Sequence, residues 1–83
     1  MSYTEHKIVV GDPGLGIILR EINEATREYT VESDSEEFVE IFGTNTFTFI
    51  KGNSAVENAI LGDVIPRHQP RAMEIIEDIK KAL

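Results

Sequence analysis

The chain has 83 residues, the size of one domain, and 41% of them are apolar and 28% charged, which is typical of a folded globular protein. It contains no cysteine, so disulfides, thiolate catalysis and cysteine-ligated zinc are excluded. Fifteen acidic and eight basic residues give a net charge of −7, which disfavours nucleic acid and anionic membranes as partners and favours cations and basic proteins.

The composition also predicts where the protein is found. A secreted domain of this size usually depends on disulfides. The N-terminal sequence MSYTEHK lacks the basic and then apolar layout of a signal peptide. No apolar run approaches the roughly 20 residues that a membrane span needs. We therefore expect a cytoplasmic protein that forms a single domain over residues 1–83.

The first part of the chain predicts a strand, a helix and a second strand. Residues 6–10 form a β-branched run that ends at Gly11, as a strand does. Asp12 and Pro13 suit the start of a helix, and apolar residues then recur at helical spacing, which predicts a helix over 13–28. Residues 29–31 read as a short strand.

The middle of the chain has two interpretations. Residues 38–42 and 46–50 are both rich in strand-forming residues, and the three residues between them suit a hairpin loop. The alternative is a helix over 35–42, capped by Asp34 and ended by Gly43. We favour the hairpin, because most residues from 38 to 42 are aromatic or β-branched.

The last part of the chain predicts two helices. The first covers residues 53–61 and ends at Gly62, and the second begins at Pro70 and carries an apolar stripe to Leu83. Because strands need helices to cover them, the order of elements predicts an α+β protein. We expect a two-layer sandwich of about four mostly antiparallel strands with two main helices packed on the sheet.

The acidic segment 31–40, VESDSEEFVE, is the candidate metal site. Calcium takes six to eight oxygen ligands, and closely spaced carboxylates can supply several of them. The candidate ligands are Glu32, Asp34, Glu36 and Glu37, to which folding could add Glu40 or Asp63. The segment is not an EF-hand, because Glu37 and Gly43 stand where that loop needs glycine and glutamate. The alternative is a solvated acidic turn.

The geometry of a strand sets a condition on this site. Alternate residues of an extended strand stand about 6.5 Å apart, so the carboxylates can share one ion only if the segment curls. The sequence Ser-Asp-Ser at 33–35 favours such a turn.

Other candidate sites are weaker. The glycine turn at 11–16 could hold a phosphate at a helix start, but it matches no established phosphate-binding motif. His6 and His68 have no neighbouring ligand and read as surface residues. No catalytic motif is present, so we expect no enzyme. Phe47 and Phe49 should face the core, which leaves the side of Phe38 and Phe42 as a possible partner surface.

Three segments together resemble a small conserved hypothetical protein of thermophilic methanogenic archaea, and the likeness covers the whole chain. They are GDPGLG at 11–16, SDSEEFVEIF at 33–42 and PRAMEIIEDIKKAL at 70–83. The resemblance implies a compact α+β domain with a calcium-binding rather than an enzymatic role. It implies no particular ligands.

The sequence therefore supports two hypotheses about function. The first is a divalent-cation-binding protein that prefers calcium and binds it weakly through the acidic segment. The alternative is a protein-interaction module, monomer or weak homodimer, that docks a basic partner through its acidic face.

Overall fold

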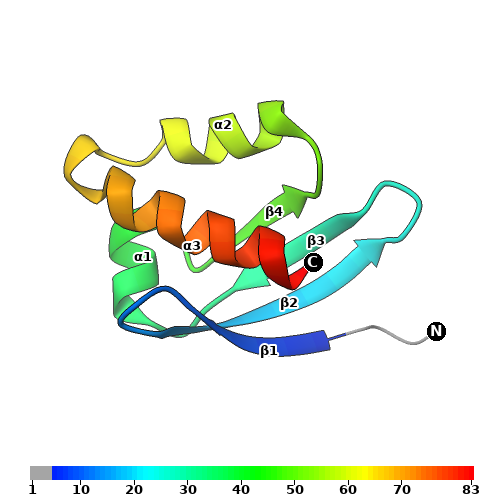
Figure 1. Ribbon diagram of the computed structural model, residues 1–83, viewed down its shortest axis with the longest axis horizontal. Coiled ribbons are helices and arrows are strands. Elements are labelled where there is room, and N and C mark those ends of the chain that lie inside the picture. The colour runs from blue at the N-terminus through cyan, green and yellow to red at the C-terminus, as the bar shows by residue number, and fades with distance from the viewer. Residues whose placement is uncertain (1–4) are drawn as a thin grey trace.

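The computed structural model describes residues 5–83, and in them the chain forms a four-stranded antiparallel sheet with three α-helices (Figure 1). The strands lie side by side in the order β1-β2-β3-β4. This confirms the α+β, two-layer expectation. The elements are β1 (Glu5–Val10), β2 (Leu15–Asn23), β3 (Glu28–Glu32), α1 (Glu36–Phe42), β4 (Thr46–Ile50), α2 (Ser54–Gly62), the 3₁₀ turn η1 (Pro66–His68) and α3 (Gln69–Ala82).

The helices lie on one side of the sheet (Figure 1). Side chains in β2 alternate accordingly: Leu15, Ile17 and Leu19 are buried, whereas Gly16 is exposed and Ile18 only partly covered. Such alternation is typical of an antiparallel sheet with one face packed and the other open. Over residues 5–83, no helix covers the second face, which we call the outer face.

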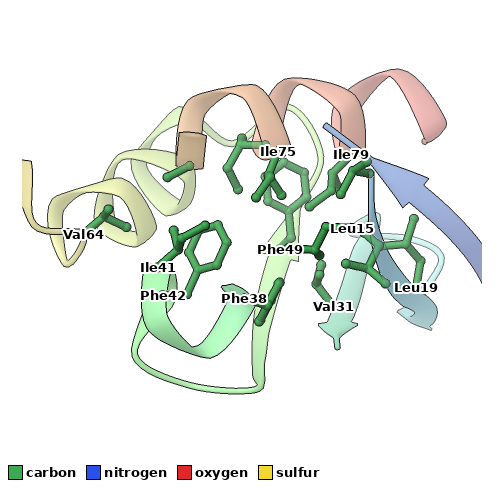
Figure 2. Packing of buried hydrophobic residues seen from close by; sticks show 14 residues of the cluster. Leu15, Leu19, Val31, Phe38, Ile41, Phe42, Phe49, Val64, Ile75 and Ile79 are labelled. Atoms are coloured by element: carbon green, nitrogen blue, oxygen red, sulfur yellow. The ribbon is translucent and has the colours of Figure 1, made fainter. Parts of the chain in front are cut away.

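The core lies between the sheet, α1 and α3 (Figure 2). Phe38 and Phe49 are fully buried, as are the isoleucines of α3 that point to the sheet. The ring of Phe38 lies 4.8 Å from that of Phe42 and 5.6 Å from that of Phe47, measured between centroids. The prediction that Phe47 and Phe49 face the core is confirmed. The suggestion that Phe38 and Phe42 form a partner surface is wrong.

The helix predicted over residues 13–28 does not form, because this segment makes a hairpin with β1. Residues 11–14 are the turn, and β2 begins at Leu15, opposite Val10. The buried residues of β2 follow a period of two, and they pair with the inward residues of β1 to fill the core. Ile18 and Ile22 supplied the helical spacing, but they belong to the other side of the strand. Long-range pairing therefore overrode the local helix signals.

The favoured hairpin at 38–50 is also wrong in its first half, and the alternative helix is what forms. Helix α1 places Phe38, Ile41 and Phe42 on one side, at the i, i+3, i+4 spacing that buries all three. Gly43 ends it with φ of 74° and donates its N–H to the carbonyl of Val39. Ser35, not Asp34, is the N-cap residue, and its side chain makes no capping bond.

The other elements agree with the sequence. The strands expected at 6–10, 29–31 and 46–50 are β1, β3 and β4, and the two C-terminal helices are α2 and α3. Asn53 caps α2, since its side chain accepts the N–H of Val56 at 3.1 Å.

Candidate functional site

The acidic segment curls as the metal hypothesis requires. It leaves the sheet at Glu32, turns at residues 33–35 and enters α1 at Glu36. Ser33 fixes this turn: its buried Oγ donates to the carbonyl of Gly16 at 2.7 Å and accepts the N–H of Ser35 at 3.0 Å. The turn is therefore tied to β2 as well as to its own backbone.

The four candidate carboxylates nonetheless have different surroundings. Glu32 bonds to Arg20 at 3.3 Å, and Glu37 bonds to Arg71 at 3.0 Å. Asp34 and Glu36 are exposed. Between residues 5 and 83, no three histidine or carboxylate side chains come together in an arrangement suited to a metal ion. Calcium binding by these four residues stays a prediction, and it requires two of them to exchange an arginine for the ion.

The additional acids lie elsewhere. The carboxylate of Glu40 is 3.9 Å from Nε2 of His68, and Asp63 is the residue that follows α2. His68 is partly buried rather than a surface residue, and its Nε2 is enclosed without a hydrogen-bond partner among the described residues. His6 is exposed on β1, as expected.

Arg71 of α3 connects three parts of the fold. Its guanidinium donates to Glu37 of α1, to Glu74 of its own helix and to the carbonyl of Pro13 in the β1–β2 turn. The side chain is only 17% exposed. Hydrogen bonds to Glu37 and Glu74 raise the pKa of Arg71 above its ordinary value, so it stays charged.

In the glycine turn at residues 11–16, two backbone N–H groups are hydrogen-bonded to carboxylates of α3. Asp78 accepts the N–H of Gly11 at 2.7 Å, and Glu74 accepts the N–H of Asp12 at 3.4 Å. No helix begins here, so the N-terminal dipole that would attract a phosphate is missing. The phosphate hypothesis for residues 11–16 loses the feature on which it depended.

The outer face of the sheet has a hollow that the sequence did not predict. It measures about 550 Å³ and lies over the end of the β1–β2 hairpin. Val9, which is 72% exposed, stands beside it, directly opposite Gly16 in the strand register. A Cβ atom on Gly16 would meet no atom within 4 Å. The hollow is lined by Lys7, Ile8, Val9, Gly16, Ile17, Ile18, Ser33, Asp34 and Ser35.

Charges on the outer face are arranged around Arg20. It bonds Glu5 at 2.8 Å and Glu32 at 3.3 Å, across both neighbouring strands. The hydrogen bond to Glu5 is the main reason that the pKa of Arg20 is raised. Lys7, on the same face, makes no ion pair within residues 5–83. With Asp34, which lines the hollow, the region holds three acids and two bases, a net charge of −1 in a chain that carries −7.

The hollow was missed because it depends on strand pairing. Once 13–28 is read as a helix, Val9, Gly16 and Ile18 cannot be placed side by side. The available signal was the alternation of Leu15, Ile17 and Leu19, which has the period of a strand.

No protein-family model, curated protein or solved structure matches this chain in the three comparisons made. In the part of the chain described, no helix has both the length and the apolar character needed to cross a bilayer.

Proposed function

We propose that the protein is a non-catalytic interaction domain that binds a protein partner through the outer face of its sheet. The observation that carries this proposal is the hollow at Gly16, flanked by the exposed Val9 and the half-buried Ile18. Isolated apolar side chains are normal on a protein surface, but apolar side chains gathered at a hollow are typical of a binding site.

Gly16 supports the proposal because the fold does not need a glycine there. Glycine inside a strand costs about 0.5–1 kcal/mol relative to alanine. Gly16 is not among the glycines with positive φ, the irregularity of β2 lies at Glu21 and Asn23, and a Cβ would have free space. The remaining reason for glycine in a strand is the close approach of another molecule.

A cross-linking experiment tests this proposal. A photoreactive amino acid at Thr30, on the outer face opposite Arg20, should capture a defined protein in cells that naturally express the chain. The same probe at Met73 on α3, which is 53% exposed, is the matched control. Capture should disappear in the Gly16→Val variant, because the new side chain fills the hollow. Equal capture from both positions, or capture that survives Gly16→Val, contradicts the proposal.

A second proposal is weak calcium binding at the acidic segment. It is supported by the turn at residues 33–35 and by the exposed Asp34 and Glu36 beside it. An exposed site with many water ligands should have a dissociation constant near the weak end, roughly 10⁻⁴–10⁻³ M.

An amide NMR titration with calcium, and separately with magnesium, measures this second proposal. We expect resonances of residues 31–40 to move with calcium and to stay in place in the double variant Asp34→Asn, Glu36→Gln. Unmoved resonances at millimolar calcium in the unaltered protein would reject it.

A further inference from the structure

We infer that the partner of the outer face is a second copy of this chain, and that the two copies pack through their β1–β2 hairpins. The inference depends on the proposed function, since it names the molecule that occupies the same face. The surface concerned, which we call the hairpin face, consists of the outward side chains of β1 and β2: Glu5, Lys7, Val9, Gly16, Ile18 and Arg20.

The strand register makes the hairpin face complementary to itself. Val9 lies opposite Gly16, and Glu5 lies opposite Arg20. The members of these two pairs are complementary: one is large and the other small, or one is negative and the other positive. The third pair, Lys7 opposite Ile18, lies between them and would place the lysine stem over the isoleucine of the second copy. In a symmetric contact of this kind, each residue meets the second copy of the residue that lies opposite it in its own chain. The contact therefore needs the two members of each opposite pair to be complementary.

One symmetry axis uses this complementarity. It lies above the hairpin face, parallel to the strands and midway between β1 and β2. Rotation by half a turn about it places β1 of one copy over β2 of the other and keeps the strands aligned, as in packed pairs of sheets. Val9 of each copy then faces Gly16 of the second copy, and Glu5 faces Arg20 of the second copy.

Shape supports this contact at the end of the hairpin. Val9 is the most exposed of the large apolar side chains in residues 5–83, and it stands next to the hollow that Gly16 leaves. Packed sheets lie about 10 Å apart, and their side chains interdigitate. A valine from one copy above a glycine of the other lets the two hairpins approach more closely at this end than two facing valines would.

Charge supports the same surface. Two molecules that each carry −7 repel one another over most of their surfaces. Around the hairpin, Glu5, Glu32 and Asp34 exceed Lys7 and Arg20 by one charge, so this region contributes little of the net charge and little of the repulsion. The face-to-face arrangement also brings Glu5 of each copy to Arg20 of the other, which adds attraction between the copies.

Sedimentation equilibrium from micromolar to millimolar protein tests the inference. The average mass should rise from 9.3 kDa toward twice that value as concentration increases. Gly16→Val should raise the dimer dissociation constant by about tenfold or more, since each tenfold step needs only one modest contact. Met73→Ser, on the helical side, is the matched control and should leave the mass curve unchanged.

An exchange of large and small residues gives the decisive variant. Val9→Gly alone places a hollow over a hollow and should also weaken the dimer. The double variant Val9→Gly, Gly16→Val moves the large side chain to the other strand, so the symmetric contact is restored. We expect its mass curve to return toward that of the unaltered protein. We expect Gly16→Val to fold normally. If Val9→Gly folds poorly, the mass curve of Gly16→Val still tests the inference.

The outcomes separate this inference from the proposed function. A monomer at millimolar concentration overturns the inference, and so does a dimer that Gly16→Val leaves intact. If the protein is a monomer and the probe at Thr30 still captures one other protein, the proposed function survives without the homodimer. If the probe also captures nothing, both are rejected.

Discussion

Two glycines of the same hairpin should respond in opposite ways to alanine. Gly11 has a φ of 80°, and a Cβ built on it would collide with Nη1 of Arg71. Gly16 has open space and an ordinary strand conformation. Gly11→Ala therefore introduces both backbone strain and a collision, while Gly16→Ala introduces neither.

The magnitude follows from these contacts. A left-handed conformation costs a non-glycine residue about 1–2 kcal/mol. Moving the guanidinium of Arg71 weakens its bonds to Glu37 and Glu74, and bonds to charged groups contribute about 1.5–3 kcal/mol when buried. Both glutamates are more than a third exposed, so we reduce this contribution to about 1 kcal/mol. Gly11→Ala should lower the free energy of unfolding by about 2–3 kcal/mol, and Gly16→Ala should raise it by about 0.5–1 kcal/mol.

Urea denaturation followed by circular dichroism measures both changes. A chain of 83 residues has a total stability of roughly 4–12 kcal/mol, so the loss at Gly11 is a large fraction of it. The midpoint of thermal unfolding should fall by about 10–20 °C in Gly11→Ala. If the two variants change stability equally, or if Gly11→Ala is neutral, the assigned roles of the turn and of Arg71 are wrong.

Three further predictions concern the core, a helix end and alkaline stability. Phe38→Ala should cost about 3–5 kcal/mol in urea denaturation, because the ring is fully buried between two other phenylalanines; Val39→Ala, on the exposed side of α1, should cost far less. Gln69→Ala should cost about 1–3 kcal/mol by the same assay, because its amide donates to the carbonyls of Leu61 and Val64 at the end of α2. Burial, and then the charge of Glu21, raises the pKa of Tyr29, so the folded protein holds this proton longer than the unfolded chain does. Stability should therefore fall as pH rises from about 10, the unfolded value, through the folded pKa, and Tyr29→Phe should reduce that fall; an identical pH profile in the variant contradicts the assignment.

The sequence predicted the number of strands correctly through two errors that cancelled. Residues 15–23 were expected to be helical and form a strand, while residues 38–42 were expected to form a strand and are helical. Both errors have one physical cause. Apolar spacing at 15, 18 and 22 and the β-branched content of 38–42 are local signals, and the choice between helix and strand depended on which residues the completed core buries.

The candidate sites differ in how visible they are in the sequence. The acidic run and the turn at 33–35 could be read directly, because both are local. The residues that bond to the carboxylates of the acidic segment could not be read from the sequence, because they are distant in the chain. Arg20 bonds to Glu32 from 12 residues away, and Arg71 bonds to Glu37 from 34 residues away. The hollow at Gly16 likewise exists only because β1 lies beside β2.

The bond between Arg71 and Glu37 determines which amide resonances should move when calcium binds. An ion held by Asp34 and Glu36 alone leaves Arg71 in place, and amide shifts should stay within residues 31–40. An ion held by all four carboxylates must take Glu37 from Arg71, which also holds the carbonyl of Pro13. Shifts should then extend to residues 11–13, and Arg71→Ala should tighten calcium binding because Glu37 is released. Tight binding without shifts in the turn, or unchanged affinity in Arg71→Ala, excludes Glu37 as a ligand.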